Sequence, residues 1–209
     1  MSANSTNKKI IVLISGNGSN LQALIDSCKN NQITGADIVQ VISSKPNVYG
    51  LERAQKAQIP THVHSLKEYK AAGKTRKDFD HDLADHIQKL KPDLIVLAGW
   101  MLILGPDFVS KFEGKLINLH PSLPGDIIGA HAIDRAYEEA KAGKRTETGI
   151  MVHYVIAEVD EGKPIASRKV PILENDSLEA LEERIHRAEH ELLPEATRMV
   201  LEGTAPSFK

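Results

Sequence analysis

The sequence predicts an α/β fold: a doubly wound, mostly parallel sheet with an antiparallel hairpin at one edge and a long C-terminal helix. Three observations support this prediction. Four predominantly apolar runs have the length and composition of buried parallel strands. Segments with helical apolar spacing alternate with these runs up to residue 120, as in βαβ units. Two later segments alternate apolar and polar residues, which is typical of antiparallel strands at a sheet edge.

The first strands and helices follow from these runs. We expect parallel strands at residues 10–14, 38–42, 94–98 and 116–119, with a short additional strand in THVHS at 61–65. Helices are expected at 19–30 and 77–90, because the apolar side chains of each segment fall on one face. Right-handed crossovers then place helices on both faces of the sheet.

The last third of the chain predicts a hairpin and a helix. Residues 150–156 and 165–173, joined by a turn around Glu161 and Gly162, are expected to pair antiparallel at the sheet edge. The long helix is expected to run from Ser177 to Glu202, since its apolar positions step by three or four. Asp176 is its predicted cap, Pro194 its predicted kink, and Gly203 its stop.

The composition is that of an ordinary globular protein and excludes several classes. The 209 residues include 26 Lys and Arg against 28 Asp and Glu, and the net charge of −2 gives no electrostatic argument for nucleic acid. Cys28 is the single cysteine, which excludes an intrachain disulfide and suits a reducing compartment. The polar residues 1–9 are expected to be a disordered lead, without a signal peptide or membrane span. We therefore expect one cytoplasmic domain over residues 10–209.

The segment SGNGSN, residues 15–20, lies between the first strand and the first helix, where doubly wound sheets bind ligands. Its two glycines allow close backbone approach, and Ser19 is expected to cap the helix with Gln22 as capping-box partner. Free N–H groups and the helix dipole there attract a phosphate. Leu21 at the third glycine position argues against a dinucleotide, and no GK[ST] follows for a triphosphate. The alternative is a glycine turn needed only for packing.

The segment INLHPSLPG, residues 117–125, ends a buried strand with two polar side chains. Asn118 and His120 are two positions apart, so both point to the same face at the strand's carboxyl end. An amide donor beside an imidazole suits proton transfer and oxyanion stabilisation in acyl transfer. Asp160, in the predicted hairpin turn, is a third candidate. The alternatives are a satisfied polar pair at a strand end and a carboxylate that only forms a turn.

The sequence shows no clear nucleophile or metal site. Cys28 falls on the inner face of the first helix and no serine stands in GxSxG, so direct transfer between two bound substrates is favoured over a covalent intermediate. HRAEH, residues 186–190, matches HxxEH but lacks a third ligand, and we expect no metal. His62 and His64 are interpreted as structural.

Taken in order, SGNGSNLQALID, LAGWM with ILGPDFV, INLHPSLPG and VHYVIAEVDEGKPI resemble motifs of the phosphoribosylglycinamide formyltransferases, a folate-dependent formyltransferase family. The resemblance covers the chain from about Ile10 to Val200. It implies a Rossmann-like formyltransferase fold that moves a formyl group from 10-formyltetrahydrofolate, the cosubstrate, to the amine of glycinamide ribonucleotide in de novo purine synthesis. It also implies a phosphate-binding half at about 10–115 and a folate-binding and catalytic half at about 116–209.

Matched position by position, the resemblance implies a role for each candidate residue. The catalytic positions match Asn118, His120 and Asp160. The ribonucleotide site matches Asn17, Gly18, Ser19, Asn20 and Glu189, which gives HRAEH a role without metal. The folate site matches Arg76, Met101, Leu102, Ile103, Leu104, Val109, Ile156, Ala157, Glu158 and Val159. The chain departs from many relatives in the loop after His120, at Leu102 where many carry Arg, and at His186 where some carry Gln.

The implied mechanism joins both lines of reasoning. The amine attacks the formyl carbon directly, Asn118 and protonated His120 stabilise the oxyanion, and Asp160 sustains the imidazolium and relays protons. Formyltransferases acting on methionyl-tRNA or sugar nucleotides would need a further domain or a basic surface, and a formyltetrahydrofolate hydrolase would carry a regulatory domain. A non-catalytic nucleotide-binding module would have no use for the three polar residues. We expect small-molecule partners only, and a monomer or homodimer.

Overall fold

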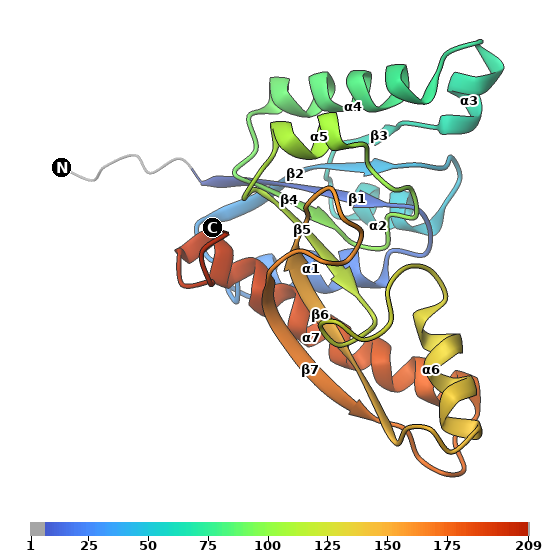
Figure 1. The fold of residues 1–209 in the computed structure, drawn as a ribbon. Coiled ribbons are helices and arrows are strands. Elements are labelled where there is room, and N and C mark those ends of the chain that lie inside the picture. The colour runs from blue at the N-terminus through green and yellow to red at the C-terminus, as the bar shows by residue number, and fades with distance from the viewer. Residues whose placement is uncertain (1–6, 209) are drawn as a thin grey trace.

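A seven-stranded sheet with helices on both faces organises the computed structural model, which describes residues 7–208 (Figure 1). The strand order is β3-β2-β1-β4-β5-β6-β7. The five strands from β3 to β5 pair in parallel, and β6 and β7 pair antiparallel, which confirms the predicted sheet. The strands are β1 Lys8–Ile14, β2 Ala36–Ser43, β3 Thr61–Val63, β4 Leu94–Leu97, β5 Leu116–His120, β6 Glu147–Tyr154 and β7 Pro164–Pro171.

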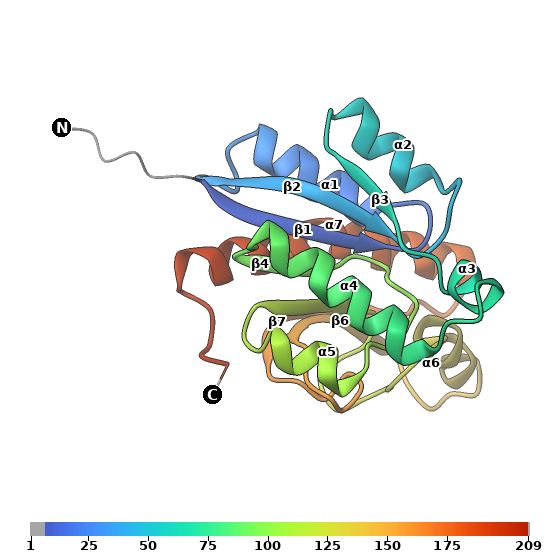
Figure 2. The same cartoon turned by 90° about the horizontal axis from the view of Figure 1, so that it is seen from above.

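The helices form a layer on each side of the sheet. In Figures 1 and 2, α4 and α5 lie over one face, and α1 and α7 lie over the other. The helices are α1 Ser19–Lys29, α2 Tyr49–Lys56, α3 Leu66–Ala71, α4 Arg76–Leu90, α5 Pro106–Lys111, α6 Ala132–Lys141 and α7 Leu178–Glu202. The predicted helices correspond to α1, α4 and α7. The sequence patterns gave no prediction for the short helices α2, α3 and α5.

Strand β1 shows how the sheet holds the two layers together. Ile10, Val12 and Ile14 pack into the core beneath α1 and α7, whereas Ile11 and Leu13 pack beneath α4 and α5. All five side chains are fully buried. Because each such side chain contributes roughly 1.5–3 kcal/mol when it leaves water, a strand that is apolar on both faces belongs at the centre of the sheet. The strand begins at Lys8, two residues inside the predicted lead, whereas residues 1–6 lie outside the described part of the chain.

The N-terminus of α1 corrects one prediction. Gly18, not Ser19, is the N-cap, with a left-handed φ of 76°, and no side chain of residues 7–208 caps it. The turn at Gly18 gives Ser19 a helical backbone, so its hydroxyl is no longer in the position of a cap. Gln22 is not a capping partner either, because its side-chain amide donates to Asp26 and its oxygen accepts from Arg53. The first-turn N–H groups of α1 therefore lack a side-chain acceptor among the described residues.

The N-terminus of α7 corrects a second prediction. Ser177 is the N-cap, and its Oγ accepts a hydrogen bond from the Ala180 N–H at 3.2 Å. Asp176, the predicted cap, instead accepts two bonds from Arg184 at 2.7 and 2.8 Å. These bonds lower the pKa of Asp176 to about 2. The helix continues through Pro194 and ends, as predicted, at Gly203 with a φ of 74°.

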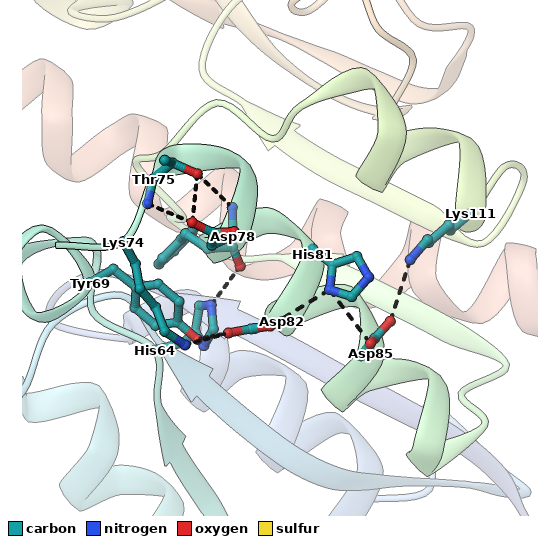
Figure 3. Close-up of polar contacts among 10 residues, drawn as sticks. His64, Tyr69, Lys74, Thr75, Asp78, His81, Asp82, Asp85 and Lys111 are labelled. Carbon is teal, nitrogen blue, oxygen red and sulfur yellow. Dashed lines mark hydrogen bonds and ion pairs between the residues drawn. The ribbon is translucent and has the colours of Figure 1, made fainter. Parts of the chain in front are cut away.

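Polar contacts fix the start of α4 and connect it to α5 (Figure 3). Thr75 and Asp78 form a reciprocal capping box, in which the Asp78 carboxylate accepts from the Thr75 N–H at 2.8 Å. Lys111 on α5 reaches Asp85 on α4 at 3.4 Å. The capping box places Arg76 on the first turn of α4, where its guanidinium donates to the Ile103 carbonyl.

Candidate active site

The candidate site lies at the carboxyl edge of the sheet, where the loops after β1 and β4 leave neighbouring strands. This is the topological switch point at which doubly wound sheets bind ligands. The two loops are joined, because the Met101 N–H donates to the Ser15 Oγ at 2.9 Å. The Ser15 Oγ also lies 2.6 Å from the Ser44 Oγ beyond β2. The loop at residues 15–20 and the loop at 99–105 are therefore held beside each other.

Asn118, His120 and Asp160 meet at the end of β5. Leu116 faces the α4 and α5 layer, and the period of two places Asn118 and His120 on the same face. The Asp160 Oδ2 lies 3.4 Å from the His120 Nδ1, and its Oδ1 accepts from the Asn118 Nδ2 at 3.4 Å. Asp160 adopts a left-handed φ of 58°, a conformation that is costly for most residues and often found at functional sites. The predicted grouping of the three side chains is thus present in the structure.

The second nitrogen of His120 is engaged by the loop that follows β5. Its Nε2 lies 2.6 Å from the Ile127 carbonyl oxygen, which can only accept, so we assign a hydrogen to Nε2. The Ser122 Oγ accepts from the Ile127 N–H at 2.9 Å, and Arg145 holds Asp126 with two bonds of 2.8 and 2.9 Å. The His120 ring therefore sits between a carboxylate and a fixed carbonyl.

His153 is a fourth member of this group that the sequence patterns did not single out. It lies directly across from Asn118 in the antiparallel register of β5 and β6 and is 2% exposed. Its Nδ1 lies 2.8 Å from the Tyr154 carbonyl oxygen, and its Nε2 lies 3.2 Å from the Asn118 Nδ2. A polar residue inside the apolar run IMVHYVI was the available signal, but its partner depends on strand register.

The Asp160 carboxylate is held in its ionised form. Burial opposes ionisation, but the neighbouring His153, with its Nε2 3.6 Å from Oδ1, the hydrogen bond from the Gly129 N–H and the nearby charge of His120 outweigh it and lower the pKa of Asp160. The Gly129 N–H donates to Oδ2 at 2.9 Å. An anionic carboxylate beside an imidazole is the arrangement of an acid and base pair.

A cavity of about 600 Å³ opens beside these polar groups. Asn118, His120, His153 and Asp160 lie at one side, and the rest of the wall is largely apolar. The predicted folate residues that line it are Met101, Leu102, Ile103, Leu104, Ile156, Ala157, Glu158 and Val159. Met101 and Ile103 are 74% and 67% exposed, which is unusual for large apolar side chains and typical of a binding surface. The cavity has the size and lining of a small-molecule site.

Two predicted folate residues lie outside this lining. Val109 is buried on α5 among the core residues beneath α4. Arg76 lines a separate cavity of about 580 Å³ between α4 and α5, although it reaches the main cavity through its bond to the Ile103 carbonyl. Its Nε also pairs with Asp80 at 3.1 Å. Arg76 is therefore connected to the main cavity only through Ile103, and Val109 belongs to the core.

The predicted ribonucleotide residues lie at the start of α1 and on α7, the helices that cover the other face of the sheet. The Asn20 Nδ2 donates to the Glu189 Oε2 at 3.0 Å, which brings α7 to the start of α1. Glu189 is 5% exposed, and this burial raises its pKa. The Asn20 Oδ1 and the His190 Nε2 are buried with no hydrogen-bond partner among residues 7–208. Buried polar atoms without partners are costly, so these two are available to a polar ligand.

The structure also bears on the metal, thiol and histidine interpretations. Among residues 7–208, no group of three or more His, Cys, Asp or Glu is arranged to hold a metal ion. Burial, together with the charge of Asp37, raises the pKa of the Cys28 thiol to about 11, which makes it a poor nucleophile. The His64 Nε2 donates to the Phe79 carbonyl oxygen at 2.8 Å inside the fold, which agrees with its structural interpretation. No helix in the described part of the chain is long and apolar enough to cross a membrane.

Fold and site together define a doubly wound α/β transferase, and comparison with known proteins gives its family. The family model described as formyl transferase matches residues 8–197, and the chain belongs to this family. It is 53% identical to the phosphoribosylglycinamide formyltransferase of Schizosaccharomyces pombe, over 92% of this chain and 96% of that protein. The enzyme of the same name from Saccharomyces cerevisiae is 48% identical over 93% and 97% of the two chains.

Solved structures agree with the sequence relatives. The structure of glycinamide ribonucleotide transformylase 1 from Symbiobacterium toebii superposes with a TM-score of 0.87 at 37% identity, covering 96% of this chain and 90% of that one. Residues 8–197 of the family match include the β5 strand, the hairpin and most of α7. The predicted formyltransferase fold is therefore confirmed, and the match extends across every part of the candidate site.

Proposed function

We propose that this protein transfers the formyl group of 10-formyltetrahydrofolate to the amine of glycinamide ribonucleotide, a step of purine biosynthesis. The observation that carries the proposal is the meeting of Asn118, His120 and Asp160 beside an apolar cavity. The loop at residues 16–20, which has the features of a phosphate-binding loop, lies at the same edge of the sheet. The printed activities of the fungal relatives support the same choice of substrates.

The ribonucleotide occupies the side of the site formed by the loop at 16–20 and α7. Its phosphate accepts hydrogen bonds from the uncapped N–H groups at the start of α1, where the helix dipole also favours an anion. Glu189 and Asn20, already joined at 3.0 Å, accept and donate to the ribose hydroxyls. The phosphate is thereby held at one end, so that the amine at the other end points toward β5.

The folate occupies the 600 Å³ cavity, with its rings against the apolar wall and its formyl group beside Asn118. Met101, Leu102, Ile103 and Leu104 form one side of this wall, and residues 156–159 form the other. Arg76, which is bonded to the Ile103 carbonyl of this wall, pairs with the carboxylates of the folate tail. Binding both substrates in one site supplies the orientation that makes direct transfer efficient.

The chemical step is an acyl transfer without a covalent enzyme intermediate. The amine nitrogen forms a bond to the formyl carbon, and the carbonyl electrons move to oxygen, which Asn118 Nδ2 and the His120 ring N–H stabilise. The proton lost by the amine passes to the His120 and Asp160 pair. When the bond from carbon to the folate nitrogen breaks, that nitrogen receives a proton, so the enzyme returns to its starting state.

The contact between His120 and Ile127 sets a requirement for this step. The Nε2–H that would donate to the oxyanion is engaged by the Ile127 carbonyl at 2.6 Å. The loop at 121–131 must therefore release Nε2 when the substrates bind. Because Asp160 remains on the Nδ1 side at 3.4 Å, the ring keeps its carboxylate partner during the exchange.

The setting of the reaction follows from the same substrates. We propose that the protein acts in the cytoplasm as a monomer or homodimer and binds small molecules rather than nucleic acid, in agreement with its net charge of −2. We further propose that it needs no metal, since the acid and base groups account for every proton in the step.

A comparison of acceptors tests the proposal. The purified 209-residue chain is mixed with 10-formyltetrahydrofolate and one acceptor: glycinamide ribonucleotide, methionyl-tRNA, an amino-sugar nucleotide, or water alone. Loss of the formyl group is followed by folate absorbance, and the acceptor is identified by mass spectrometry. Formyl transfer only to glycinamide ribonucleotide is the expected result. Equal folate turnover with water alone would make the protein a hydrolase and contradict the proposal.

A further inference from the structure

Arg53 on α2 contacts the loop at residues 16–20, and it is not among the proposed catalytic and binding residues. Its Nε donates to the Asn17 carbonyl oxygen at 3.0 Å, and its Nη2 donates to the Asn17 Oδ1 at 3.0 Å. Its Nη1 donates to the Gln22 Oε1 at 3.3 Å. The guanidinium also stacks on the Tyr49 ring, 4.6 Å from the ring centre. All three nitrogens of the guanidinium are thus directed at one loop and the helix it begins.

The backbone of α2 is pressed against the same loop. The Gly50 N–H donates to the Gly16 carbonyl oxygen at 3.1 Å. A Cβ on Gly50 would lie 2.4 Å from the Ile14 side chain, and a Cβ on Gly18 would lie 2.7 Å from the Gly50 Cα. Side chains at these two glycines would therefore separate α2 from the loop. Their absence brings Arg53 within reach of Asn17.

Arg53 holds the loop rather than binding the phosphate itself. An anion site built from backbone N–H groups needs those groups to point in fixed directions, and the left-handed turn at Gly18 has no side-chain cap among the described residues. The contacts from Arg53 to Asn17 replace that missing support from outside the loop. The charge of Arg53 also acts at the site. The pKa of His190 is lowered chiefly by burial and, to a smaller extent, by the charges of His186 and Arg53.

We propose that Arg53 is a positioning residue, which preorganises the loop at 16–20 for the phosphate of the ribonucleotide. The inference rests on the proposed function and adds a residue from a second helix to the ribonucleotide site. The proposed role requires a guanidinium group at this position. A lysine keeps the charge but cannot donate in two parallel directions, so only the planar fork of arginine satisfies both oxygens of Asn17.

The test compares Arg53→Lys and Arg53→Met with the control Lys56→Met. Lys56 lies on the same helix, also contacts the Tyr49 ring at 5.2 Å, and is exposed. Wild-type protein is assayed first with both substrates, because failure to formylate glycinamide ribonucleotide would contradict the proposed function and not the role of Arg53. The Kd of the ribonucleotide and of the folate is then measured by calorimetry for each variant, with kcat and both KM values and a thermal unfolding curve.

Both Arg53 variants are expected to weaken ribonucleotide binding about 10- to 100-fold, which corresponds to losing two hydrogen bonds. The folate Kd and kcat at saturating ribonucleotide should change less than about twofold, and Lys56→Met should resemble wild type. Full ribonucleotide affinity in Arg53→Lys would refute the demand for a fork. Equal weakening of both substrates would show a general structural role and also overturn the proposal.

A double-mutant cycle gives a second measurement that does not depend on one variant. Asn17→Ala removes the Oδ1 acceptor of Arg53 but leaves the carbonyl acceptor. If Arg53 acts through Asn17, the loss of ribonucleotide affinity in Arg53→Met with Asn17→Ala should be clearly smaller than the product of the single losses. Multiplicative losses would mean that Arg53 acts elsewhere and would contradict the inference.

Discussion

Replacing Asp160 with Asn isolates the charge of the carboxylate from its shape. The left-handed φ of 58° at this position is tolerated by Asn. The side-chain amide oxygen of Asn can still accept the hydrogen bond that the Gly129 N–H donates to the Asp160 Oδ2 at 2.9 Å in the wild-type protein. The variant is therefore expected to fold. What it loses is the negative charge 3.4 Å from the His120 Nδ1, together with an acceptor for the Asn118 amide.

The size of the effect follows from that distance. Two unit charges 3.4 Å apart interact by about 5 kcal/mol at an effective dielectric constant of about 20. This attraction favours the imidazolium of His120 in the transition state, and its full loss would correspond to about 10³- to 10⁴-fold in rate. Acid and base assistance typically contributes about 10²- to 10⁴-fold, so we expect kcat to fall within that range.

Single-turnover formyl transfer across a range of pH provides the assay. Asp160→Asn should lower the rate and change its pH profile while the Kd of each substrate changes little, whereas the exposed neighbour Glu161→Gln should behave as wild type. The double variant with His120→Ala should be scarcely slower than His120→Ala alone, because the two groups act as a unit. Multiplicative losses, or near-normal turnover in Asp160→Asn, would show that the carboxylate only shapes its turn.

Three further predictions follow. Ser19→Asp places a carboxylate in the first turn of α1, which the helix dipole tolerates but a phosphate repels. Calorimetry should therefore show a higher Kd for glycinamide ribonucleotide and an unchanged Kd for the folate. Equal losses of affinity for both substrates would contradict the phosphate site. Activity should survive exhaustive chelation, and an assay restored only by added metal would overturn the metal-free mechanism. Burial lowers the pKa of His62, His64 and His86, so the unfolded chain binds more protons than the folded chain. The free energy of unfolding should therefore hold above about pH 7 and fall as the pH drops below about 6.5. Urea titrations should show a flatter dependence of this free energy on pH when His62 and His86 are replaced by Gln, and an unchanged dependence would refute this cause.

Much of the fold could be predicted because strand and helix periods are local properties. The apolar run of β1 and the helical spacing of α1 each specify one element without reference to the rest of the chain. The shared face of Asn118 and His120 also follows from the strand period alone. These predictions needed no knowledge of tertiary contacts.

The remaining features depend on register and close approach. His153 joins the site because β5 and β6 pair with Asn118 opposite it, and no local pattern specifies that register. Gly18, the N-cap of α1, lies against Gly50, which is remote in sequence and which no local pattern indicates. The engagement of His120 by Ile127 depends on a loop that is held by Arg145 from another segment.

Direct transfer from folate to ribonucleotide is the central claim, and one labelled single-turnover experiment tests it. Wild-type protein in excess is mixed with glycinamide ribonucleotide and 10-formyltetrahydrofolate carrying a ¹³C formyl carbon, and quenched samples are analysed by mass spectrometry of the small molecules and of the intact protein. The account predicts that the label moves into the ribonucleotide at the rate at which it leaves the folate, while the mass of the protein stays unchanged. Label on the protein, or label released as formate with no formylated ribonucleotide, would contradict it.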